Sequence, residues 1–184
     1  MTGVRRRHTV RWLAAGVLAI TAAIVAVLAT RPPAGATEVD TPLLGKTAPA
    51  VSGATLDGRG FDLESLRGRW VVLNFFASWC PPCQQEEPQL VSFAFHHSGP
   101  GQPALVGVVY DDSASGARGF LAQSGATWPA VADPNGQIAI DYGVRGPPET
   151  FVISPGGQVV VHLDGAVTEQ GLDTWLARAE RGET

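Results

Sequence analysis

The feature that most constrains the fold of this chain is a pair of cysteines placed between an apolar run and a helical segment. Cys80 and Cys83 are the only two cysteines among 184 residues, and two prolines separate them. The apolar run Val71–Phe76 precedes the pair, and Gln84–His96, which we expect to be helical, follows it. A strand followed directly by a helix would place the Cys80 sulfur at the surface, under the free N–H groups and the positive end of the helix dipole. The motif therefore predicts an α/β unit with a stabilised thiolate at the start of a helix.

Three kinds of chemistry fit two cysteines at this spacing. A structural disulfide would close a loop of only four residues, worth about 2 kcal/mol in the chain-entropy model. A zinc site usually needs four ligands, and the sequence offers no second Cys-x-x-Cys and no ligand spacing among its histidines, His8, His96, His97 and His162. Thiol–disulfide exchange needs only two cysteines, one to attack a disulfide and a second within reach to resolve the mixed disulfide, and this sequence has both. We interpret the pair as a site of thiol–disulfide exchange, with the structural bridge and the metal site as alternatives.

The N-terminal part of the chain has the pattern of a membrane anchor. Residues 1–11 are basic, and residues 12–30 form an apolar run. About eighteen helical residues at 1.5 Å each span roughly 27 Å, enough to cross the hydrocarbon core of a bilayer. Four arginines precede the run and only Arg31 follows it, so the positive-inside rule places the N-terminus in the cytoplasm.

This arrangement gives a predicted order of parts along the chain. A cytoplasmic basic segment (1–11) and a single-pass transmembrane signal anchor (12–30) lead through a linker (31–42) to an extracytoplasmic domain (43–184) at the cell membrane. The linker is rich in proline, glycine and threonine and has no hydrophobic periodicity. Ala34-Gly35-Ala36 resembles a small-residue cleavage site, so removal of the leader is the alternative to an uncleaved anchor.

The charge distribution excludes one class of partner. All 17 acidic residues follow residue 37, whereas five of the 13 basic residues lie within the first 31. The domain after the linker is therefore strongly acidic, and we expect it not to bind nucleic acid.

The hydrophobic pattern predicts an α/β domain with a mixed sheet. Asp57-Gly58 between two short alternating segments indicates a β-hairpin over 51–63. Expected strands and helices follow in alternation, with Pro88 expected to interrupt and kink the first long helix. The strands are 70–76, 104–110, 128–132, 150–153 and 158–163, and the helical segments are 64–66, 81–97, 113–124, 137–142 and 168–181.

Two sequence blocks resemble a known family. Asn74-Phe-Phe-Ala-Ser-Trp-Cys-Pro-Pro-Cys-Gln-Gln-Glu-Glu-Pro88 is similar to the active-site stretch of membrane-anchored thioredoxin-like proteins of the TlpA/ResA/CcmG (DsbE) group. Tyr142-Gly-Val-Arg-Gly-Pro-Pro-Glu-Thr-Phe151 is similar to the cis-proline segment most typical of the CcmG (DsbE) branch. The resemblance covers about residues 43–181, and it implies a thioredoxin-like fold with an N-terminal β-hairpin extension.

The resemblance also implies roles for individual residues. Cys80 would be the attacking thiol and Cys83 the resolving thiol, joined as a disulfide in the oxidised form. Pro148 would be the cis-proline opposite them. Asn74 stands where cytoplasmic thioredoxins carry a buried aspartate, so Glu86 would take over proton transfer. The alternative for Glu86 is a carboxylate that merely favours the first turn of the helix.

Three further residues are candidates for substrate contact. Trp79 would pack beside the cysteines and present its exposed edge to a partner. Pro147 keeps its carbonyl acceptor for pairing with a substrate strand but has no N–H donor. Glu149 either contacts substrate or only begins a strand.

The two prolines between the cysteines favour reduction over oxidation. Pro81 and Pro82 have no N–H to offer the Cys80 sulfur. Fewer donors stabilise the thiolate less, so we expect a higher thiol pKa and a more reducing couple than in a donor-rich Cys-x-x-Cys.

The expected function is thiol–disulfide exchange outside the cytoplasm, mainly as a reductase of protein disulfides. The sequence contains no NAD- or flavin-binding motif, so we expect no cofactor, and electrons would come from a membrane thiol donor. Resemblance to CcmG and ResA implies that the substrate is apocytochrome c, reduced at its haem-attachment cysteines. A disulfide oxidase and a non-catalytic apocytochrome or haem-binding module are the alternatives. A thiol peroxidase does not fit, because neither cysteine follows a Pro-x-x-x-Thr-x-x pattern.

Overall fold

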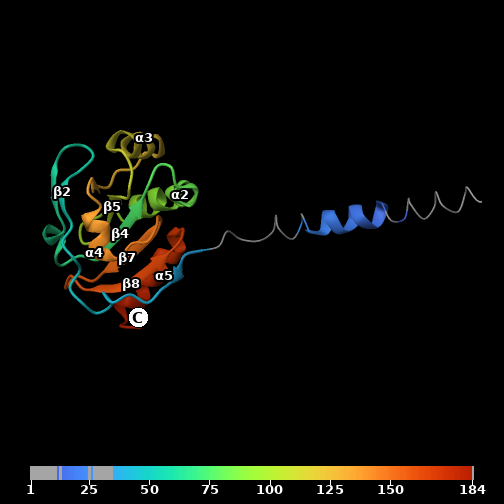
Figure 1. The fold of residues 1–184 in the computed structure, drawn as a ribbon. Coiled ribbons are helices and arrows are strands. Elements are labelled where there is room, and N and C mark those ends of the chain that lie inside the picture. Colours follow the sequence, from blue (N-terminus) through green and yellow to red (C-terminus); the bar gives the residue numbers. More distant parts are fainter. Residues whose placement is uncertain (1–11, 13, 25, 27–34, 184) are drawn as a thin grey trace, which may run out of the picture. The chain divides into compact units, whose positions relative to one another are not determined.

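The computed structural model describes Trp12, residues 14–24, Ala26 and residues 35–183, in two compact units, Met1–Pro33 and Ala34–Thr184 (Figure 1). In the first unit, residues 14–24 are helical with exposed side chains. Among the described residues, no helix is both long enough and apolar enough to cross a membrane. The predicted basic segment 1–11 lies outside the described residues, as does part of the predicted anchor 12–30.

A mixed six-stranded sheet forms the centre of the second unit, in the order β1-β8-β7-β4-β5-β6. The central strand β4 (Val71–Phe76) runs parallel to β5 (Ala104–Val109) and antiparallel to β7 (Glu149–Ile153). On one side β5 pairs in parallel with β6 (Ala130–Val131), and on the other β7 pairs with β8 (Val159–Asp164) and β8 with β1 (Thr37–Glu38), both antiparallel. The predicted mixed sheet is therefore confirmed.

Alternate residues of β4 point to opposite faces of the sheet, as the period of a strand requires. Val71, Leu73 and Phe75 pack on the face that α4 (Gln137–Tyr142) covers. Val72 packs on the other face with residues of α2 (Pro81–His96) and α5 (Glu169–Glu180). All six residues of β4 are buried, which explains the continuous apolar run and makes the single polar residue within it, Asn74, conspicuous.

Side chains cap the first turn of α2 and of two later helices. The Cys80 sulfur accepts from the Cys83 N–H at the start of α2, and the hydroxyls of Ser113 and Thr168 cap α3 (Ala114–Ser124) and α5. These are the residue types and the geometry of N-caps, apart from the sulfur. α2 continues as one helix through Pro88, so the predicted interruption does not occur.

The predicted hairpin forms beside the sheet. β2 (Ser52–Ala54) pairs antiparallel with β3 (Gly60–Asp62), and Gly58 in the turn has a φ of 85°, a conformation that glycine adopts without steric cost. Beyond β2 the chain pairs with the edge strand β6, because the Leu56 N–H donates to the Ala130 carbonyl at 2.8 Å. The 3₁₀ turn η1 (Leu63–Leu66) follows β3.

One strand was not anticipated from the sequence. β1 lies within the segment expected to be a linker, and the compact unit that contains it begins at Ala34. Its side chains are exposed, so the segment shows no alternation of apolar residues. Backbone pairing with β8 gives it its place in the sheet.

Candidate active site

The two cysteines lie where the central strand gives way to its helix. β4 ends at Phe76, Cys80 is the N-cap of α2, and Cys83 lies in its first turn. The two residues form a disulfide, with Cα atoms 5.3 Å apart. Cys80 is 2% exposed and Cys83 1% exposed. The prediction of a surface sulfur on Cys80 is therefore wrong for this state, because the disulfide packs into an apolar cluster formed by β4, β5, α3 and the hairpin.

Two main-chain groups face the Cys80 sulfur. The Cys83 N–H donates to it at 3.2 Å. The carbonyl oxygen of Pro147 lies 3.3 Å away. A carbonyl dipole stabilises a thiol and repels a thiolate, whereas an N–H does the opposite. An N-cap side chain can accept from the N–H groups of the second and third helical residues, which here are Pro82 and Cys83. Because Pro82 has no N–H, the Cys80 sulfur has a single backbone donor from this turn.

The loop that carries Cys80 is fixed to the neighbouring β5–α3 loop. The Ser78 N–H donates to the Asp112 carboxylate at 2.7 Å, and the Trp79 indole N–H donates to the Asp111 carbonyl at 3.0 Å. The Gln84 amide closes the turn by donating to the Ser78 carbonyl at 2.8 Å. Trp79 remains 54% exposed, so its indole offers an apolar surface beside the disulfide.

Glu86 lies one turn beyond Cys83 on α2 and is 1% exposed. Its carboxylate accepts from the Asn74 amide at 2.9 Å and from the Val167 N–H at 2.8 Å. Asn74 also donates to Thr150 at 3.1 Å, its partner across the β4–β7 ladder. Burial raises the pKa of Glu86 to about 8, against the opposing effect of the two hydrogen bonds. A carboxyl with this pKa can hold or release a proton near neutral pH, as a proton-transfer group requires.

The predicted cis-proline segment lies against the cysteines. The Pro147–Pro148 peptide bond is cis, and Pro148 accepts from the Gly165 N–H at 3.0 Å. Glu149 is the first residue of β7 and is 1% exposed. Glu149 therefore begins a strand, which is one of the two roles expected for it, and its contact with substrate stays a prediction.

The Glu149 carboxylate joins two parts of the chain. One oxygen accepts from the Arg145 and Gly146 N–H groups at 2.7 and 3.2 Å, and the other lies 2.6 Å from His162 Nε2. Burial by itself would raise the pKa of Glu149, but the hydrogen bonds from His162, Arg145 and Gly146 outweigh it and hold the pKa below its usual value.

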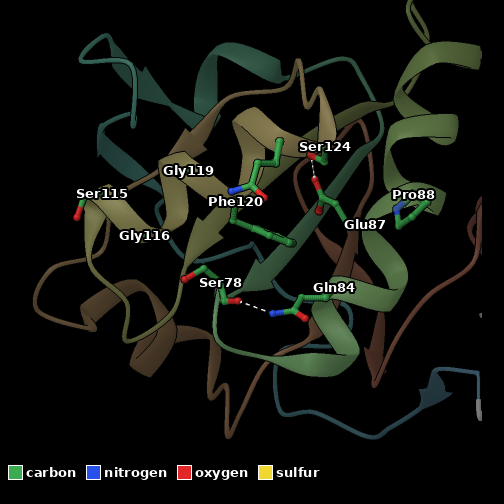
Figure 2. A pocket seen from close by; sticks show the side chains of 10 residues that line it. Ser78, Gln84, Glu87, Pro88, Ser115, Gly116, Gly119, Phe120 and Ser124 are labelled. Atoms are coloured by element: carbon green, nitrogen blue, oxygen red, sulfur yellow. Dashed lines mark hydrogen bonds between the residues drawn. The ribbon is translucent and has the colours of Figure 1, made fainter.

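A groove of about 730 Å³ runs between α2 and α3 and begins at the active-site loop (Figure 2). Ser78 and Gln84 line the end nearest the cysteines, and Phe120 projects from α3 between the helices. Glu87 lies farther along, where it accepts from the Ser124 hydroxyl at 2.6 Å. Burial raises the pKa of Glu87, and the bond from Ser124 partly offsets this. Glu87, Asp112 and His162 are not predictable as site residues from the sequence, because a lone acid or histidine has no local signal of its tertiary partner.

A Cys-x-x-Cys disulfide at the N-terminus of the helix that follows the central strand, with a cis-proline loop against it, defines a thioredoxin-like protein. The chain belongs to the AhpC/TSA family, whose model matches residues 44–162. A DsbE homolog from Paracoccus denitrificans, a thiol:disulfide interchange protein, is 38% identical over 76% of this chain and 76% of its own length. The thiol-disulfide oxidoreductase ResA of Bacillus subtilis is 31% identical over 76% of this chain and 78% of its own length.

A solved structure supports the same assignment. The crystal structure of a thioredoxin-family thiol:disulfide interchange protein from Chlorobium tepidum superposes with a TM-score of 0.67 at 26% identity, and covers 77% of this chain and 99% of that one. With Cys80 and Cys83 at disulfide distance, the chain is a thiol–disulfide oxidoreductase.

Proposed function

We propose that this protein is a membrane-anchored reductase of protein disulfides outside the cytoplasm, acting on the haem-attachment cysteines of apocytochrome c. The observation that carries the direction of the reaction is the surroundings of the Cys80 sulfur. It has one backbone N–H donor at 3.2 Å and a carbonyl oxygen at 3.3 Å. These surroundings stabilise a thiolate poorly, and a poorly stabilised thiolate makes the dithiol a better reductant.

The reaction would proceed in two exchanges. The Cys80 thiolate attacks one sulfur of the substrate disulfide, which forms a mixed disulfide and releases the other substrate sulfur as a thiolate. Cys83, as a thiolate, then attacks the Cys80 sulfur and displaces the second substrate thiolate. The substrate gains two electrons and, once protonated, two protons, and the protein is left with the Cys80–Cys83 disulfide.

We assign the proton of the second exchange to Glu86. Cys83 is 1% exposed, so bulk water reaches its thiol poorly. Glu86 is three residues further along α2, on the same side of the helix. With a pKa of about 8 it can accept the Cys83 proton when that thiol becomes the nucleophile.

The proposed cellular setting is the outer side of the cell membrane. It rests on the basic and apolar N-terminal pattern over 1–30 and on resemblance to the CcmG and ResA branches. A membrane thiol donor would return Cys80 and Cys83 to the dithiol form, since the exchange leaves them oxidised.

Trapping of the mixed disulfide tests the substrate and the reaction together. A Cys83→Ala variant of the full chain cannot resolve the intermediate, so substrates should accumulate as disulfide-linked adducts of Cys80. Adducts should contain apocytochrome c, and they should be absent from the Cys80→Ser/Cys83→Ala control. Adducts formed only with other secreted proteins would refute the cytochrome substrate.

The reduction potential separates the reductase from the alternatives. A potential near that of thioredoxin, about −270 mV, supports reduction, whereas one near that of DsbA, about −120 mV, would indicate a disulfide oxidase. A Cys80→Ser variant that still supported cytochrome c assembly would indicate a non-catalytic binding module.

A further inference from the structure

His162 is a buried histidine whose contacts lead to the active-site loop. It lies on β8 and is 4% exposed. Its ring stacks on Phe151, with centroids 4.1 Å apart and planes at 10°. Its Nε2 lies 2.6 Å from the Glu149 carboxylate, whereas its Nδ1 is buried without a hydrogen-bond partner among the residues that the structure describes.

The unpartnered Nδ1 shows that packing alone does not account for a histidine here. A buried polar atom without a partner costs stability, and a purely apolar ring would avoid that cost. The remaining polar contact of the ring is the hydrogen bond to Glu149. The hydrogen bond that His162 makes to the Glu149 carboxylate therefore accounts for a histidine at this position.

Glu149 also binds the loop that precedes the cis-proline. Its other oxygen accepts from the Arg145 and Gly146 N–H groups at 2.7 and 3.2 Å. The next residue, Pro147, directs its carbonyl oxygen to within 3.3 Å of the Cys80 sulfur. A continuous set of contacts thus runs from β8 through Glu149 and the loop to the reactive sulfur.

We propose that His162 is a positioning residue for the redox centre: through Glu149 it holds the loop 145–147 so that the Pro147 carbonyl faces Cys80 and disfavours its thiolate. The proposal rests on Cys80 being the attacking thiol and not on the identity of the substrate. Without the Nε2–H donor, the buried Glu149 carboxylate would keep only the two loop N–H groups as donors and would lose the hydrogen bond that fixes it to β8, so the carboxylate and the loop that it holds would shift more easily. The Pro147 carbonyl would then contact the Cys80 sulfur less often and would disfavour its thiolate less.

The test compares two substitutions at one position. His162→Phe keeps an aromatic ring against Phe151 but has no N–H donor, whereas His162→Gln can place a side-chain N–H near the position of Nε2. His97→Leu is the matched control, because His97 also joins a carboxylate, that of Asp173 at 2.8 Å, but does so between α2 and α5 at the surface. All three are made in the full chain.

Two readouts respond to the thiol and need no substrate. They are the Cys80 pKa, from the pH dependence of alkylation, and the equilibrium constant with glutathione. His162→Phe should lower the Cys80 pKa and shift the equilibrium three- to tenfold toward the dithiol, where tenfold corresponds to about 30 mV. His162→Gln and His97→Leu should match the wild type in both.

Two results would overturn the proposal. In one, His162→Phe lowers thermal stability but leaves the Cys80 pKa and the glutathione equilibrium unchanged, which would make His162 a packing residue. In the other, His162→Gln shifts both readouts as much as His162→Phe does. If His162→Phe does not fold, Glu149→Gln replaces it, and the same shift is expected because the charged acceptor for the loop is lost.

Discussion

The Glu86 carboxylate accepts a hydrogen bond from the Asn74 side chain at 2.9 Å, in the interior between α2 and the central strand. Asn74 is the only polar residue of β4. An amide at this position can donate to the Glu86 carboxylate without adding a further charge beside it.

Glu86→Gln should remove a pH dependence of stability. In the unfolded chain this carboxyl titrates near 4.5, and in the folded protein burial raises its pKa to about 8. Because the folded state binds the proton more tightly, the free energy of unfolding is highest below pH 4.5, falls as the pH rises toward 8, and is then level. At 1.36 kcal/mol per pKa unit the loss is at most roughly 5 kcal/mol.

Urea unfolding of the oxidised protein at pH 5 and pH 8.5 measures this effect. Glu86→Gln should flatten most of the difference between the two pH values, while Glu180→Gln, at the exposed end of α5, should keep it. An unchanged difference in Glu86→Gln would show that Glu86 is not the group responsible.

Asn74→Asp should make the same pH dependence steeper. It would place a second carboxyl within hydrogen-bond distance of Glu86, and two such groups cannot both ionise without strong repulsion. The free energy of unfolding should therefore fall further between pH 5 and pH 8.5 than in the wild type. Asn135→Asp, at an exposed position, is the control. Parallel profiles for the two variants would contradict the role given to Asn74.

Pro82→Ala should make the couple more oxidising, whereas Pro81→Ala should have little effect. Cys80 is the N-cap of α2, so Pro81 and Pro82 occupy its first and second positions. An N-cap side chain receives N–H groups from the second and third positions but not from the first. One added hydrogen bond of about 1 kcal/mol would lower the Cys80 pKa by roughly 0.7 units.

Titration of both variants against glutathione, together with the pH dependence of Cys80 alkylation, gives the comparison. Equal shifts in the two variants would mean that the rigidity of the prolines, and not their missing N–H groups, sets the potential.

Gly119→Ala should stabilise the protein, and Gly116→Ala should perturb the active-site loop. Both glycines lie on α3 and line the groove. A Cβ at Gly119 would meet nothing within 4 Å, so the substitution gains helix propensity of about 1 kcal/mol. A Cβ at Gly116 would lie 2.9 Å from Ser113 Oγ, 3.0 Å from Asp112 Oδ1 and 3.1 Å from Ser78 Oγ.

The melting temperature should therefore rise for Gly119→Ala and fall for Gly116→Ala. Only Gly116→Ala should also slow disulfide exchange, because Asp112 holds the Ser78 N–H at 2.7 Å. A rise in both melting temperatures would show that the contacts around Gly116 relax freely.

The elements of the fold were largely predictable because their signals are local. The buried run at β4, the Asp57-Gly58 turn and the amphipathic pattern of α5 each predict an element that the structure contains. β1 is not predictable from the sequence, because its exposed residues show no periodicity and its place depends on pairing with β8. The uninterrupted course of α2 through Pro88 is not predictable either, since tertiary packing can outweigh the local cost of a helical proline.

The sequence by itself determined the chemistry of this protein: two thiols at the start of a helix, with no donor on the two residues between them. Spacing decides this, because residues three apart in a helical turn are close whatever surrounds them. Only the tertiary structure decided how that chemistry is tuned. The burial of Cys80, the raised pKa of Glu86 and the contact of the Pro147 carbonyl with the Cys80 sulfur each depend on residues that are far apart in sequence. Desolvation and hydrogen bonding depend on which of these groups are in contact, and the packing of the sheet and helices determines those contacts.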